Sequence, residues 1–155
     1  MAMIRQLTLV AAFPLILFSQ EKSAVIQSMT PNLMVQDVNR SVEFYRDVLG
    51  FEVIATVPDS GTLNWAWMKN GTAELMFQTA PSLGEDIPEF KGKAIGATQT
   101  LYTKVQNVRN LHEQIKDKVT VILGLKKTFY GMEEFTMKDP DGYLITFASE
   151  VKDDK

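Results

Sequence analysis

The sequence predicts an α+β fold made of two tandem β-α-β-β-β units, and three observations support this prediction. The segment Thr30–Asp47 recurs seventy residues later as Thr100–Asp117. Each copy begins with strand-like alternation and continues with a capped apolar stripe at helical spacing. Each copy ends in a hairpin signal. The identical pairs are Thr30/Thr100, Val35/Val105, Gln36/Gln106, Val38/Val108, Glu43/Glu113 and Asp47/Asp117.

The first unit opens with a strand and a helix. Leu33 and Val35 alternate with polar or flexible neighbours, the period of a half-buried strand. Asp37 stands where an N-cap belongs, and Gly50 ends the helix as a C′ glycine does. The apolar stripe between them consists of Val38, Val42, Tyr45, Val48 and Leu49.

Three further strands complete this unit. Residues 51–57 are predicted as a strand that ends at the turn cluster 58–61. Residues 63–69 and 73–78 flank Asn70-Gly71, the strongest short hairpin signal.

The second unit repeats this order. A strand at 98–105 precedes a helix that is capped by Asn107 and carries Val108, Leu111 and Ile115. A strand at 119–125 follows, and residues 133–138 and 143–149 form a hairpin around Asp139–Gly142.

Length and composition are those of one globular domain of 155 residues. The predicted divisions are a segment at 1–28, a domain at 29–150 and a polar tail at 151–155. The domain comprises units at 29–80 and 98–150 and a linker at 81–97 that is rich in Gly, Pro and charge.

Charge and residue counts exclude several classes of protein. A net charge of -3 and a pI near 5.2 argue against nucleic-acid binding. The absence of cysteine excludes disulfides, thiolate metal sites and cysteine nucleophiles. His112 is the single histidine, which leaves little room for histidine-based catalysis.

The N-terminal segment has two interpretations. Arg5 followed by the apolar run Leu7–Phe18 has the shape of a secretory signal over residues 1–19, and it is too short to span a membrane. Alternatively, the segment is an extra strand or helix that packs on the domain of a cytoplasmic protein, or it results from an upstream start, with Met29 as the beginning of the core. The sequence leaves both localisations open.

The chain resembles a known family at three places. The run Asp37–Phe51, the Asn70-Gly71 hairpin and the closing Asp139–Tyr143 segment are similar to the glyoxalase/bleomycin resistance/dioxygenase group, also called the vicinal oxygen chelate superfamily. The resemblance implies a curved open sheet, with helices on the outer face and a central cleft. The family contains metal-dependent isomerases, lyases and dioxygenases as well as metal-free binding proteins, so the fold leaves function open.

The same resemblance implies four metal-ligand positions on the first and last strands of the units. In this sequence they carry Thr30, Glu74, Thr100 and Thr146, of which only Glu74 is a strong donor. His112 lies on the second helix, facing outward or against the sheet. We therefore expect no metal and no other cofactor.

Alternation along the strands selects the side chains expected to line the cleft. We expect Glu74 to contact the ligand or to act as a general base. The alternative interpretation is that its carboxylate faces solvent and has no role in binding. The threonines could instead be present only because threonine favours strands. Trp65 and Trp67 could instead pack in the core. The expected ligand-binding residues are Thr30, Asn32, Met34, Trp65, Trp67, Met76, Gln78, Thr100, Tyr102, Lys104, Tyr130, Phe135 and Thr146.

The predicted function is that of a metal-independent small-molecule binding protein, active as a homodimer. Its cleft would hold an organic ligand between the two units. One alternative is a lyase or isomerase with Glu74 as general base, or a metal enzyme with an atypical site. Another is a degenerate scaffold with a protein–protein role. Neither nucleic acid nor an integral membrane span is expected.

Overall fold

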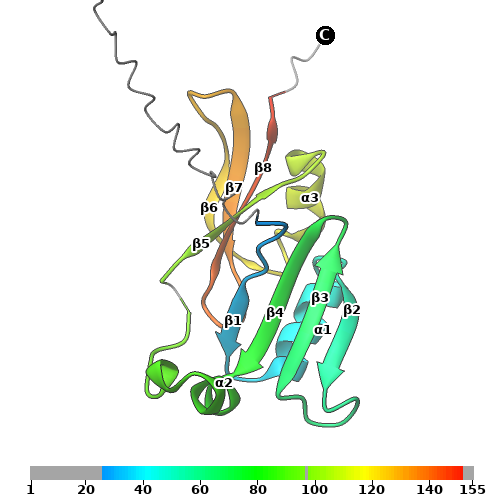
Figure 1. Cartoon of the computed structure of the whole chain (residues 1–155). Helices are drawn as coiled ribbons and strands as arrows, with labels where there is room; N and C mark the ends of the chain where they lie inside the picture. Colours follow the sequence, from blue (N-terminus) through cyan, green and yellow to red (C-terminus); the bar gives the residue numbers. More distant parts are fainter. Residues whose placement is uncertain (1–25, 97, 152–155) are drawn as a thin grey trace, which may run out of the picture.

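The computed structural model describes residues 26–96 and 98–151, which form two four-stranded mixed sheets with helices (Figure 1). The predicted signal-like residues 1–19 lie outside this range, as does most of the tail at 151–155. Within the described part of the chain, no helix has the length and apolar character needed to cross a membrane. The α+β fold of two tandem units with open sheets is confirmed.

The first unit has the predicted element order. It comprises β1 (Asn32–Val35), α1 (Val38–Asp47), β2 (Glu52–Val57), β3 (Trp65–Asn70) and β4 (Ala73–Thr79), with the sheet order β1-β4-β3-β2. The Asp37 side chain accepts a hydrogen bond from the Arg40 backbone N–H, as an N-cap does. Gly50 follows the helix with a φ of 69°, the left-handed conformation expected of a C′ glycine.

The second unit repeats the arrangement. It comprises β5 (Thr100–Lys104), α3 (Val108–Ile115), β6 (Thr120–Lys127), β7 (Met132–Lys138) and β8 (Leu144–Glu150), with the sheet order β5-β8-β7-β6. The duplication extends to strand register. Asn32 pairs with Met76 across β1 and β4, and the residues seventy positions later, Tyr102 and Thr146, pair across β5 and β8.

The segment between the units is not all loop. It contains α2 (Ala80–Asp86) and the 3-10 turn η1 (Pro88–Phe90), where the sequence predicted a linker at 81–97. Thr79 caps α2 through Ser82, and a proline occupies its first turn, both common signals for a helix start. Leu83 is buried and anchors the helix.

One hydrophobic core holds both units together. Each sheet packs its helix on one face, and these two faces contribute to the same cluster of buried side chains. Alternation along the strands leaves the opposite face of each sheet outside this core. The core includes Leu33, Val35, Val42, Tyr45, Met68 and Phe77 from the first unit, and Val108, Ile115, Phe135, Met137, Ile145 and Phe147 from the second.

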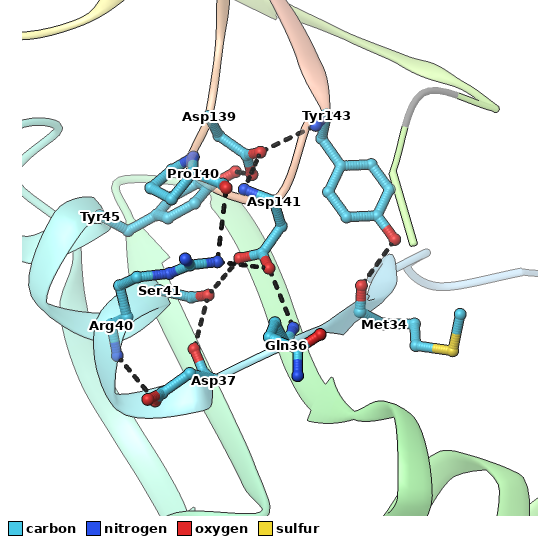
Figure 2. A network of polar contacts seen from close by, with 10 residues as sticks. All are labelled: Met34, Gln36, Asp37, Arg40, Ser41, Tyr45, Asp139, Pro140, Asp141 and Tyr143. Carbon is cyan, nitrogen blue, oxygen red and sulfur yellow. Dashed lines mark hydrogen bonds and ion pairs between the residues drawn. The ribbon is translucent and has the colours of Figure 1, made fainter. Parts of the chain in front are cut away.

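The turn between β7 and β8 joins the units by hydrogen bonds (Figure 2). The Asp141 carboxylate accepts from the Gln36 backbone N–H at 2.9 Å, Arg40 Nη2 at 2.8 Å and Ser41 Oγ at 2.9 Å. Asp139 accepts from the buried Tyr45 hydroxyl at 2.9 Å. These contacts fix the C-terminal hairpin against the start of α1.

Candidate functional site

Most of the predicted ligand-binding residues lie on the two sheet faces that point away from the core. We call these faces the first and the second open face. The first carries Asn32, Met34, Trp65, Trp67, Glu74, Met76 and Gln78, and the second carries Thr100, Tyr102, Lys104, Glu134, Thr136 and Thr146.

Glu74 is a half-buried residue at the start of β4, next to the residues that precede β1. Thr30 Oγ1 donates to Glu74 Oε2 at 3.2 Å, which is the contact expected of a cleft-facing carboxylate. A crevice of about 310 Å³ opens at this point between the two units, and Glu74, Thr100 and Tyr102 are among its lining residues. The structure thus brings these three predicted residues together. Leu49, Phe51 and Phe147 add apolar surface to the crevice.

Asn32 and Gln78 belong to a second polar group, on the side of the linker. Asn32 Nδ2 donates to Gln78 Oε1 at 2.8 Å, and Gln78 Nε2 donates to Ser82 Oγ at 3.0 Å and to Asp86 Oδ2 at 2.7 Å. Asn32 and Met34 line a separate hollow of about 450 Å³ next to η1. The hydrogen bonds of Gln78 therefore fix α2, whereas Asn32 and Met34 line the hollow.

Trp65 and Trp67 are half-buried side chains of the first open face. They occupy alternate positions of β3, opposite Gln78 and Met76 of β4. The indole N–H of Trp67 is buried and, among the described residues, has no hydrogen-bond partner. A buried donor without an acceptor is uncommon in folded proteins.

On the second open face, Glu134 is the residue that the sequence analysis missed. The residue is 7% exposed, and its Oε1 accepts from Tyr102 Oη at 2.7 Å and from Tyr130 Oη at 2.6 Å. Donation to this carboxylate is the main cause that raises the pKa of Tyr102 to about 12, and it also raises the pKa of Tyr130. Both phenols therefore stay protonated near neutral pH.

Phe135 does not lie on the second open face. It is buried in the core, with its ring 5.0 Å from that of His112 and 5.4 Å from that of Phe147. In the predicted hairpin, one strand ends at residue 138 and the next begins at residue 143. With these ends paired, residue 135 would be the cross-strand partner of Thr146 and share its face. In the structure Lys138 pairs with Leu144, and Thr136 pairs with Thr146.

The reason is a turn that is one residue longer than predicted. Because side chains alternate between faces, a slip of one residue exchanges the two faces of a strand. The backbone N–H of Asp139 donates to the Tyr143 carbonyl at 2.9 Å, so the turn extends through Tyr143. The Asp139 carboxylate also accepts from the Tyr143 N–H at 2.8 Å.

The four positions that the family resemblance implies as metal ligands carry one carboxylate, at Glu74, and three neutral hydroxyls, at Thr30, Thr100 and Thr146. Glu74 has one hydroxyl beside it, and Thr146 Oγ1 is hydrogen-bonded to Thr136 Oγ1 at 2.9 Å. Within residues 26–96 and 98–151, no group of three or more His, Asp or Glu side chains is arranged to hold a metal ion. One carboxylate with neutral hydroxyls is a weak donor set for a divalent transition metal.

Comparison with known proteins identifies the family of the chain. Residues 26–147 match the model of the Glyoxalase/Bleomycin resistance protein/Dioxygenase superfamily. Proteins called bleomycin resistance protein, from Geobacillus stearothermophilus and from Staphylococcus aureus, are 26% identical over 132 residues, which covers 83% of this chain and 99% of theirs.

Solved structures give the same result for the fold. A protein of unknown function from Agrobacterium tumefaciens has a TM-score of 0.68 at 26% identity, covering 83% of this chain and 97% of its own. A glyoxalase/bleomycin resistance protein/dioxygenase from Nocardioides has a TM-score of 0.69 at 15% identity, covering 86% and 90%. The chain belongs to the Glyoxalase/Bleomycin resistance protein/Dioxygenase superfamily.

Proposed function

We propose that this protein binds a small organic molecule without the help of a metal ion. The observation that carries the proposal is the crevice between the units, where Glu74, Thr100 and Tyr102 meet apolar side chains. Its volume of about 310 Å³ is in the range of small-molecule sites. A carboxylate, a hydroxyl and a phenol beside apolar surface suit a ligand with a hydrophobic body and a few polar groups.

The small number of strong metal ligands at this site supports metal independence. A neutral threonine hydroxyl binds a transition metal weakly, and Thr30 already donates to Glu74. A carboxylate accepts several hydrogen bonds, so Glu74 can accept one from an N–H or O–H group of the ligand in addition to that from Thr30.

We also propose that the functional form is a homodimer. The first open face leaves Trp65 and Trp67 half-buried, and the adjacent edge strand β2 exposes Val53, Ile54 and Val57. Val57 is the cross-strand partner of Trp65 and extends the apolar surface of that face. An exposed apolar patch of this kind is characteristic of an interface. Sedimentation equilibrium tests the proposal: twice the 17.4 kDa chain mass is expected, and a monomer at all concentrations rejects the dimer.

The binding proposal is tested by a thermal-shift screen of an organic compound library, followed by calorimetric titration of a hit. The Glu74→Gln variant is expected to bind the hit more weakly by about 1–3 kcal/mol, the range for an unmet buried partner. Glu43→Gln, the same change at an exposed residue of α1, is the matched control and should bind normally.

Three results would change the conclusion. Elemental analysis of the purified protein should find no stoichiometric zinc, nickel, iron or manganese, and about one ion per chain contradicts metal independence. A Glu74→Gln variant that binds the hit normally but no longer converts it identifies a lyase or isomerase instead. A screen without any binding compound rejects the proposed function.

A further inference from the structure

The carboxylate of Glu134 is a buried charge on a face outside the core. Its neighbours along β7, Glu133 and Phe135, point toward α3, where Glu133 forms an ion pair with Arg109. Glu134 points the other way, beside Ala148 of β8, which has no exposed surface. Burying an ionised carboxylate is costly unless it is paired and hydrogen-bonded.

Two phenols meet part of that requirement. Tyr102 and Tyr130 both donate to the same oxygen, Oε1, at 2.7 and 2.6 Å. In the described part of the chain, both of these hydrogen bonds end on Oε1, and no ion pair to the carboxylate is found. The second oxygen is not among the buried atoms without a partner there, so it stays accessible to solvent and to a ligand. Lys126 is the cross-strand neighbour of Glu134 on β6, but it is exposed and forms no ion pair with it.

The two phenol rings that donate to this carboxylate are themselves partly exposed to solvent. Tyr102 is 51% exposed and Tyr130 is 53% exposed, so the rings cover Glu134 while keeping surface of their own free. Phe129, at the tip of the β6–β7 hairpin, is fully exposed and packs edge-on against Tyr130 with ring centroids 5.0 Å apart. A carboxylate flanked by accessible aromatic rings has the composition that binds organic ammonium groups, through charge attraction and cation–π contact.

We propose that Glu134, Tyr102 and Tyr130 form a binding site for an organic ammonium group of the ligand. This inference rests on the proposed small-molecule function, because it names the chemical class of one part of the ligand. Tyr102 connects the two sites, since it donates to Glu134 and also lines the crevice that contains Glu74. A ligand with an ammonium group at Glu134 would extend its remaining atoms past Tyr102 into the crevice.

The test uses choline and its neutral isostere 3,3-dimethylbutan-1-ol as probes of the full-length protein, observed by NMR titration. Choline should shift the ring signals of Tyr102 and Tyr130, and the isostere should bind at least about tenfold more weakly because it lacks the charge. Glu134→Gln should weaken choline binding at least about tenfold, since the amide keeps the shape but not the charge. Tyr130→Leu, at an exposed position, should weaken it several-fold without disturbing the core.

The matched control is Glu133→Gln, which neutralises the adjacent residue on the opposite face of β7 and should leave choline binding unchanged. Equal binding of the neutral isostere overturns the inference, as does normal choline binding by Glu134→Gln. If a library compound binds in the Glu74 crevice while choline does not bind, the ammonium site is rejected and the proposed function stands. If no compound of either kind binds, the proposed function fails as well.

Discussion

Removing the Tyr45 hydroxyl tests whether the two units are held together by a buried, charged hydrogen bond. Tyr45 has no exposed surface, and its hydroxyl donates to Asp139 Oδ2 at 2.9 Å (Figure 2). The other carboxylate oxygen of Asp139 already accepts from the backbone N–H groups of Asp141 and Tyr143. Tyr45→Phe therefore leaves Oδ2 without its donor and keeps the ring that packs on Phe77.

The expected loss follows from the chemistry of this one contact. A hydrogen bond to a charged group contributes about 1.5–3 kcal/mol, so the free energy of unfolding should fall by about 2 kcal/mol. For a chain of this length, that corresponds to a Tm lower by about 4–8 °C. Urea unfolding should give a lower midpoint with an unchanged slope, because the ring still fills its place in the core.

A matched variant and the pH dependence make the test specific. Tyr143→Phe removes a buried hydroxyl that donates at 2.9 Å to the neutral Met34 carbonyl, so its loss should be smaller. The Tyr45 hydroxyl lowers the pKa of Asp139, so the variant's folded state binds a proton more readily. The stability gap between wild type and Tyr45→Phe should therefore widen as pH rises through the folded-state pKa of Asp139. A loss below about 0.5 kcal/mol, or a gap independent of pH, refutes the reasoning.

Two further predictions concern the same turn. Burial raises the pKa of Asp139 above its ordinary value of 3.8, so its folded state retains a proton over a window above that pH. Its contribution to stability should decline as pH rises through this window, and carboxyl NMR titration should place its midpoint above 3.8; a midpoint at or below that value contradicts the prediction. Gly96 has a φ of 80°, and a Cβ there would clash with the Asp141 carbonyl oxygen. Gly96→Ala should lower the unfolding free energy by at least about 2 kcal/mol, whereas Gly61→Ala, at the similar φ of 84° but with nothing near its Cβ, should lose less.

Local signals predicted the elements well because each depends on neighbours in sequence. Asp37 and Asn107 cap the two main helices through their side chains, as the sequence indicated. The helix α2 is the exception, although its own local signals are present in Thr79 and Pro81. The Gly, Pro and charged residues within α2 and after it favoured a linker for the whole segment 81–97.

The candidate site was predicted only in part, because its composition depends on strand register. The contact between Thr30 and Glu74 is present, since β1 and β4 pair as the repeat implies. One extra residue in the turn before β8 places Phe135 in the core and Glu134 on the second open face. The alternation of Phe135 and Met137 with Glu134 and Thr136 is the local signal that favours the observed faces. The hydrogen bonds of Asp139 fix the turn that goes with this register.

The sequence by itself determined the duplicated β-α-β-β-β unit, its helix caps and the Asn70-Gly71 hairpin, and it carries a single carboxylate among the ligand positions that the family resemblance implies. The tertiary structure decided which side chains share a face and how the units meet. Asp141 contacts Arg40 and Ser41, about a hundred positions earlier in the chain, and Tyr102 reaches Glu134 from another strand. Such contacts form because a buried carboxylate must find donors, and only the folded chain brings those donors within reach.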